Sequence, residues 1–286
     1  ISVESDGLQR WIRVHLPGET SVIEHFNVRQ RKSQYVVFIS VLTHKKLLSI
    51  VPTCSCHKVS EVQSGSAMHI DTVTIRADRF PVPDVYPFNI PALAETREIA
   101  LDSPVTFFMG ENGTGKSTLL QAIARRCNMP IWGGAERARY RQNPHEEDLY
   151  KYISVKWTAG SVPGSFFSAD IFRNFAQNLD EWASMDPGVL EYFGGASLLT
   201  QSHGESLMSF FRSRYAIKGL YLLDEPETAL SPRRCIELLC ILRHMGQKGH
   251  AQFIVCSHSP LLLACPGATI YSFDHAPVQR CAYEDS

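Results

Sequence analysis

The chain has 286 residues, of which 44% are hydrophobic, so it can bury a substantial core as one large domain or two small ones. Its formal net charge is −1, which excludes a global positive field that would recruit nucleic acid. The apolar runs are far shorter than the roughly 20 residues of a membrane-spanning helix, so we expect no span. Eight scattered cysteines suit buried thiols in a reducing cytoplasm, where we expect the protein to work.

The first 67 residues differ in composition from the rest of the chain. They contain none of the six methionines and carry more basic than acidic residues. We predict strands at 11–16 and 35–42, and we interpret residues 1–67 as an extension outside a core domain at 68–286. A small regulatory or partner-binding domain is the alternative. Because the chain begins at Ile1, we expect a fragment or a processed product, and no segment has the pattern of a signal peptide.

The strongest motif follows a predicted strand at 105–109, which is preceded by predicted strands at 69–76 and 96–101. The motif is Gly110-Glu111-Asn112-Gly113-Thr114-Gly115-Lys116-Ser117-Thr118, and it fits G-x-x-x-x-G-K-[ST] with no mismatch. Its glycines permit positive backbone dihedrals, so that N–H groups can surround phosphate oxygens. We predict that Lys116 lies near the β and γ phosphates and that the Ser117 hydroxyl binds Mg²⁺. A helix at the end of the loop would add its positive terminus.

The region after this helix gives weaker signals. Arg137, Arg139 and Arg141 alternate, as cations on one face of a strand would. Such a stripe could follow a nucleic-acid backbone, or it could be a solvated edge that discourages sheet pairing. We predict a strand at 152–157 and an amphipathic helix at 166–179 whose phenylalanines pack in the core.

Three further motifs lie in the last third of the chain. The run Ser202-His203-Gly204-Glu205-Ser206 precedes a predicted helix at 207–215. A hydrophobic strand from residue 219 ends in Asp224 and Glu225, a predicted helix at 233–245 follows, and a buried strand at 251–256 ends before His258. Since the ends of parallel strands meet at one rim of a sheet, we expect three of the four motifs to share that rim.

These four motifs, in this order, resemble those of ATP-binding cassette ATPases of the soluble branch that includes SMC, RecF and overcoming-lysogenization-defect proteins. More closely, residues 68–286 are similar to small bacterial AAA family ATPases. These share the Tyr-Pro-Phe-x-Ile-Pro lead-in at 86–91, the Ser-His-Gly-Glu-Ser signature at 202–206, Leu-Leu-Asp-Glu-Pro-Glu-x-Ala-Leu-Ser-Pro at 222–232 and Ser-His-Ser-Pro at 257–260. The resemblance implies an α/β fold: a three-layer P-loop NTPase core with a mostly parallel sheet, antiparallel strands at its N-terminal side and a helical insertion before the signature.

The resemblance also implies ATP and Mg²⁺ as cofactors and a role for each motif. The loop from Gly110 to Thr118 would bind the triphosphate, and Asp224 would position Mg²⁺ together with Ser117. Glu225 would be the general base, and His258 would contact the γ-phosphate. Ser202 and Gly204 would act on the nucleotide of a second subunit.

Two departures from the pattern stand out. His203 replaces the first glycine of the transporter-type signature, and no convincing glutamine follows the early strand to sense Mg²⁺.

The sequence therefore predicts a Mg²⁺-dependent ATPase that forms a head-to-tail homodimer on ATP and converts hydrolysis into conformational change. By analogy with the branch, it would serve a DNA-related or phage-defence process with an effector protein or nucleic acid as partner. One alternative is a nucleotide-gated interaction module in which hydrolysis is incidental. The other is the ATPase subunit of a transporter.

Overall fold

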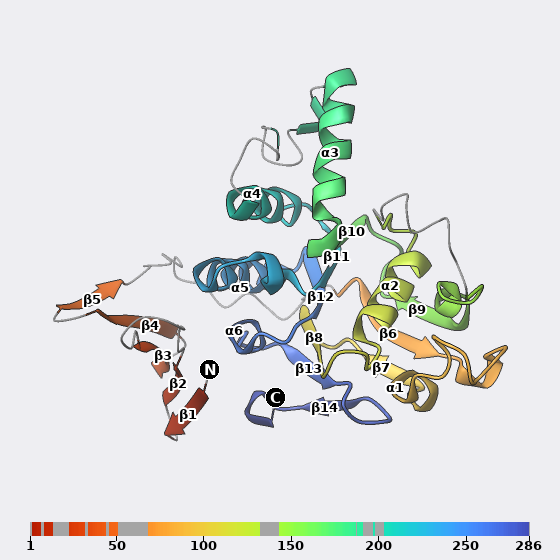
Figure 1. Ribbon diagram of the computed structural model, residues 1–286, viewed down its shortest axis with the longest axis horizontal. Helices are drawn as coiled ribbons and strands as arrows, with labels where there is room; N and C mark the ends of the chain where they lie inside the picture. Colours follow the sequence, from red (N-terminus) through yellow and green to blue (C-terminus); the bar gives the residue numbers. More distant parts are fainter. Residues whose placement is uncertain are drawn as a thin grey trace. The chain divides into compact units, whose positions relative to one another are not determined.

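The computed structural model describes residues 2–6, 9–13, 23–31, 34–43, 46–50, 68–131, 143–186, 188–190, 197 and 203–285. The chain forms two compact units, Ile1–Gln63 and Ser64–Ser286, each with its own sheets (Figure 1). In the described part of the chain, no helix is both long enough and apolar enough to cross a membrane.

The first unit contains antiparallel strands. Strand β1 (Ser2–Asp6) pairs with β2 (Gln9–Arg13), and a second sheet has the order β3 (Ile23–Arg31), β4 (Gln34–Thr43), β5 (Lys46–Ile50). The strands predicted at 11–16 and 35–42 overlap β2 and β4.

The second unit is built on a six-stranded sheet with the order β10-β11-β12-β8-β13-β14. All neighbours are parallel except β13 and β14. Every residue of β11 and of β12 is buried, as expected for mainly apolar strands that are covered on both faces. The strands are β8 (Val105–Met109), β10 (Gly164–Ser168), β11 (Gly219–Asp224), β12 (Ala251–Cys256), β13 (Thr269–Ser272) and β14 (Gln279–Cys281).

Two hydrophobic cores lie on the two faces of this sheet. Leu222 and Ile254 point into one core and Leu223 and Val255 into the other, because successive residues of a strand face opposite sides. The first core is covered by α1 (Pro91–Glu95), α2 (Lys116–Arg126) and an antiparallel sheet of β7 (Glu98–Ala100), β6 (Ile70–Ile75) and β9 (Ile153–Trp157). The second is covered by α3 (Ala169–Met185), α4 (His203–Arg214), α5 (Pro232–Gln247) and α6 (Pro260–Leu263), which lie on the other side of the sheet in Figure 1. Short 3-10 turns lie at Ala77–Arg79, Asp148–Tyr152, Pro226–Ala229 and Tyr283–Asp285.

This arrangement confirms the expected three-layer α/β core, with a mostly parallel sheet and antiparallel strands from the N-terminal side. A buried glutamine joins the two sheets. The Gln252 side-chain oxygen accepts hydrogen bonds from the backbone N–H groups of His69 and Ile70, both at 2.9 Å, and its Nε2 donates to the Ile70 carbonyl. The small sheet is thereby fixed to β12.

The helix predicted at 166–179 is wrong at its start. Residues up to Ser168 form β10, and α3 begins at Ala169. Phe166 packs in the first core and Phe167 in the second, so the two adjacent rings are buried on opposite faces of a strand. Burial on both faces removes the alternation that distinguishes a strand from a buried helix in the sequence.

The parallel register brings three strand ends to one rim of the sheet. In the β11–β12 ladder, Asp224 lies opposite Cys256, and in the β12–β8 ladder Cys256 lies opposite Phe108. The loops after β8, β11 and β12 therefore leave the sheet side by side. The predicted common rim is confirmed.

Candidate active site

The loop after β8 has the backbone geometry of a phosphate-binding loop. Gly110, Gly113 and Gly115 have φ of 138°, 86° and 102°, values that residues with a side chain rarely adopt. A Cβ atom at Gly115 would also lie 2.9 Å from Ile90 Cγ2, so the neighbouring α1 segment leaves no room for one. Helix α2 begins directly afterwards at Lys116 and directs its N-terminus at the loop.

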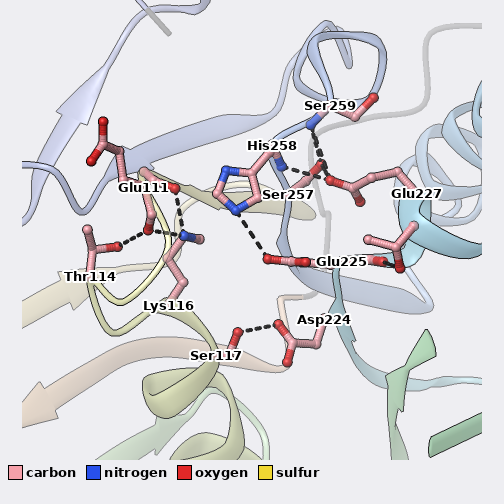
Figure 2. A network of polar contacts seen from close by, with 12 residues as sticks. Glu111, Thr114, Lys116, Ser117, Asp224, Glu225, Glu227, Ser257, His258 and Ser259 are labelled. Atoms are coloured by element: carbon pink, nitrogen blue, oxygen red, sulfur yellow. Dashed lines mark hydrogen bonds and ion pairs between the residues drawn. The ribbon is translucent and has the colours of Figure 1, made fainter. Parts of the chain in front are cut away.

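Lys116 is folded against its own loop. Its Nζ donates hydrogen bonds of 2.6 Å to the carbonyl oxygens of Gly110 and Glu111 (Figure 2). The residue is 4% exposed, and burial lowers the pKa of its ammonium, although the nearby carboxylates of Glu225 and Asp274 favour the charged form. The loop thus holds a cation at its centre, where a polyphosphate would need one.

Ser117 and Asp224 meet between the loop and the end of β11. The Ser117 hydroxyl donates a hydrogen bond of 2.7 Å to Asp224 Oδ1. Asp224 is buried, which raises its pKa to about 6 in spite of the Ser117 bond, and the neighbouring Glu225 carboxylate acts in the same direction. A divalent cation would reverse this effect because it favours the ionised carboxylate.

The donor set fits Mg²⁺ rather than a metal caged by the protein. No group of three or more His, Cys, Asp or Glu side chains that could hold a metal occurs among the residues the structure describes. Mg²⁺ is usually held by one or two side chains, with phosphate and water oxygens completing its octahedron. The Ser117 hydroxyl and the Asp224 carboxylate supply the two oxygen ligands that this pattern requires.

Glu225 and His258 form a side-chain pair at the same rim. His258 Nε2 lies 3.1 Å from Glu225 Oε1, and Figure 2 shows this pair beside Lys116. Glu225 has φ 45° and ψ 54°, a left-handed conformation that is unusual for a residue with a side chain. The Cys256 carbonyl accepts the Glu225 N–H at 3.0 Å, and the Glu225 carbonyl accepts the Thr228 hydroxyl at 2.8 Å. A strained backbone held by such bonds is typical of functional positions.

Three residues that we did not single out also hold this site. Glu227 Oε1 accepts hydrogen bonds from Ser257 Oγ and from the His258 N–H, both at 2.7 Å. Asp274 Oδ1 accepts the Glu111 N–H at 2.6 Å, and Tyr86 OH lies 3.1 Å from Thr118 Oγ1. Glu227 and Tyr86 stand in quoted motifs and could have been found there. Asp274 follows β13, a strand that the sequence reading missed.

The signature is only partly placed. Ser202 lies outside the described residues, as do Arg137, Arg139 and Arg141, so their predicted roles stay predictions. Gly204 lies in the first turn of α4, and a Cβ atom there would meet nothing within 4 Å. At the rim, Ser168 at the end of β10 lies opposite Asp224 at the end of β11.

Comparisons with known families match two segments of the chain. Residues 188–264 match the family described as "AAA domain, putative AbiEii toxin, Type IV TA system", and residues 88–127 match a second AAA domain family. The first segment contains the Asp224–Glu225 and His258 motifs, and the second contains the loop from Gly110 to Thr118.

Two curated relatives are ATP-binding proteins. The chain is 27% identical over 164 residues to "Thiamine import ATP-binding protein ThiQ" of Ruegeria sp. (strain TM1040), covering 53% of this chain and 69% of that one. It is 28% identical over 178 residues to "Probable siderophore transport system ATP-binding protein YusV" of Bacillus subtilis (strain 168), covering 56% of this chain and 63% of that one.

Solved structures resemble the chain more loosely. The SMC head domain from Thermotoga maritima gives a TM-score of 0.42 at 14% identity, covering 75% of this chain and 98% of that one. A putative metal-chelate type ABC transporter in an inward-facing conformation gives 0.44 at 14% identity, covering 76% and 85%. Scores this low do not bear on function.

Proposed function

We propose that this chain, an ATPase by its AAA-type segments and its ATP-binding relatives, binds ATP with Mg²⁺ and hydrolyses the β–γ phosphoanhydride. The contact of 3.1 Å between Glu225 and His258 carries the proposal. It lies at the rim where Lys116 and the Ser117–Asp224 pair also lie (Figure 2). A phosphate loop alone binds nucleotide, whereas an acid and an imidazole beside it supply the groups that hydrolysis requires.

Each of these side chains then has a defined role. Lys116 would exchange its loop carbonyls for the β and γ phosphates, and Ser117 with Asp224 would hold Mg²⁺. The bound Mg²⁺ supplies positive charge against the phosphate oxygens. Glu225 orients a water molecule and accepts its proton, and His258 holds Glu225 in place and contacts the γ-phosphate.

We propose further that two copies close head to tail around two nucleotides. The support is the resemblance of residues 202–206 to a signature that acts in trans, together with the start of α4 at His203. Gly204 lies in the first turn of α4, where backbone N–H groups have no helical partner and can bind an anion. Hydrolysis would then open the pair.

The first experiment separates binding from chemistry. Glu225→Gln keeps the shape and hydrogen-bonding reach of the side chain but removes the base, so phosphate release should fall by about a hundredfold or more. ATP-bound dimers should accumulate in size-exclusion chromatography with Mg-ATP. Glu98→Gln, an exposed carboxylate on β7, is the matched control and should leave both readouts unchanged. An unchanged rate in Glu225→Gln contradicts the proposed role of Glu225.

The second experiment tests action in trans. Ser202→Arg should spare nucleotide binding by the single chain but block closure, because its bulk would cover the anion site. In a mixed dimer with Lys116→Ala chains, one composite site carries both defects and the other carries neither. Partial activity should therefore return on mixing. Absence of recovery at every mixing ratio contradicts independent composite sites.

The relatives favour a second candidate, the ATPase subunit of a transporter, because one is named as a thiamine import ATP-binding protein and the other as a probable siderophore transport system ATP-binding protein. A third reading is a nucleotide-gated interaction module with incidental hydrolysis. The Glu225→Gln variant separates a protein driven by hydrolysis from a nucleotide-gated module. It should abolish the biological effect of the former and make the biological effect of the latter permanent. The DNA-related or phage-defence process, the effector partner and the cytoplasmic location stay predictions from the resemblance and the cysteine content.

A further inference from the structure

Two loops at the rim are joined by one carboxylate. Glu227 lies in the 3-10 turn Pro226–Ala229 after β11, and residues 257–259 follow β12. Glu227 Oε1 accepts three hydrogen bonds, from Ser257 Oγ and the His258 N–H at 2.7 Å and from the Ser259 N–H at 3.2 Å (Figure 2). Ser257 Oγ in turn accepts the Ser259 N–H at 3.0 Å. Three donors of the loop after β12 thus share a single acceptor oxygen.

The Glu227 carboxylate is less accessible to solvent than that of a simple surface acid. Within the described residues, Glu227 Oε2 is buried and has no hydrogen-bond partner. Buried polar atoms are almost always paired, and an exception needs an explanation. The three donors on Oε1 fix the orientation of the carboxylate and leave Oε2 in a buried position without a donor.

These hydrogen bonds to Glu227 lie just beyond the end of the β11–β12 ladder. The last paired residues of β11 and β12 are Asp224 and Cys256. Beyond them, the Glu225 N–H still donates to the Cys256 carbonyl at 3.0 Å, and the Ser257 N–H donates to the Phe108 carbonyl of β8 at 3.1 Å. The backbone of His258 is next fixed by Glu227, and its ring then reaches Glu225 Oε1. The Glu225–His258 contact therefore depends on where Glu227 holds the His258 backbone.

We propose that Glu227 is a positioning residue that sets the Glu225–His258 pair and acts on hydrolysis only through His258. The inference rests on the proposed function, in which this pair performs the chemistry. Glu227 itself contacts the loop after β12. Replacing Glu227 should leave nucleotide affinity unchanged and should lower the rate of the chemical step.

A double-mutant cycle in the full chain tests this. Glu227→Ala should lower kcat for ATP by about tenfold to a hundredfold, since small displacements of catalytic groups have effects of that size. KM should change by less than about threefold. Glu227→Gln keeps an acceptor oxygen at the same reach and should restore most of kcat. In a His258→Ala background, Glu227→Ala should lower kcat by less than about twofold more, because the residue through which it acts is gone.

Equal losses of kcat in both backgrounds would overturn the proposal, as would an unchanged kcat in Glu227→Ala. Thermal melting of each variant shows whether the chain is folded. If Glu227→Ala does not fold, Glu227→Asp takes its place in the same cycle, because the carboxylate is then one methylene too short to reach all three donors.

A readout without turnover separates this inference from the proposed function. In protein labelled for NMR at histidine, Glu225→Gln should shift the His258 ring resonances when Glu227 is present and should leave them unshifted in Glu227→Ala. A shift of equal size in both contradicts the positioning role. If His258→Ala hydrolyses ATP at the parent rate, the catalytic assignment of His258 fails, and the NMR comparison still decides the role of Glu227.

Discussion

Replacing Asp224 with asparagine should stabilise the folded chain above pH 6, although it should abolish Mg²⁺-dependent turnover. Asp224 is 8% exposed, and burial raises its pKa from 3.8 to about 6. The folded chain therefore binds a proton at this carboxyl more tightly than the unfolded chain does. The resulting contribution to stability is fully present below pH 3.8 and is lost as the pH rises through about 6.

The magnitude follows from the two pKa values. One pKa unit corresponds to about 1.4 kcal/mol, so a rise from 3.8 to about 6 corresponds to about 3 kcal/mol in the free energy of unfolding. About half of this should be lost between about pH 5 and about pH 8. Asparagine resembles the neutral carboxyl, and its oxygen can still accept the Ser117 hydrogen bond. The Asp224→Asn variant should therefore not lose this stability as the pH rises.

Urea unfolding without nucleotide or magnesium, from about pH 5 to about pH 8, measures the effect. The stability of Asp224→Asn relative to the parent should grow by about 1.5 kcal/mol over this range. Asp102→Asn is the control. Burial alone would raise the pKa of Asp102, but the hydrogen bonds from Arg280 and Thr269 and the Arg280 charge together lower it, so this acid is ionised throughout the range. If the difference in the free energy of unfolding between Asp224→Asn and the parent does not change with pH, the reasoning is refuted.

Three further predictions are testable. Lys116→Ala should lower ATP affinity by at least about tenfold, because a charged hydrogen-bond donor to phosphate is lost; tight binding of a fluorescent ATP analogue would contradict the site. A chain that begins at Met68 should fold and hydrolyse ATP like the parent, and a large drop in melting temperature would place the first 67 residues in the domain. Gly113→Ala should cost about 1 kcal/mol for its left-handed backbone, and Gly115→Ala should cost more because its Cβ meets Ile90; equal melting temperatures would contradict this.

Much of the site could be predicted from local sequence. The loop after β8, the acids at the end of β11 and His258 after β12 each follow a mainly apolar run, and such runs form buried parallel strands. Parallel strands end at one rim, so the order of the motifs already implied their meeting. The ladders from β11 through β12 to β8 confirm it. The chemical role of each residue stays a prediction.

The sequence could not show which contacts fix these groups. Phe166 and Phe167 are consistent with a helix or a strand until the neighbouring strand β11 is known. Asp274 lies 163 residues from Glu111, to which it is hydrogen-bonded, and nothing local to either residue indicates the other. The pKa of Asp224 is likewise raised by burial that many segments create together.

The difference between what could and what could not be predicted from the sequence has one physical origin. Strand, loop and helix are specified by neighbours in the chain, through apolar runs, glycine dihedrals and the helix that follows Lys116. The bonds from Glu227 to the loop after β12 are specified only by the register of β11 on β12, which brings residues 30 and 31 positions apart within hydrogen-bonding distance. The sequence by itself determined which groups this ATPase carries at the rim, and the tertiary structure decided how they are held, because hydrogen bonds between loops form only after the sheet has assembled.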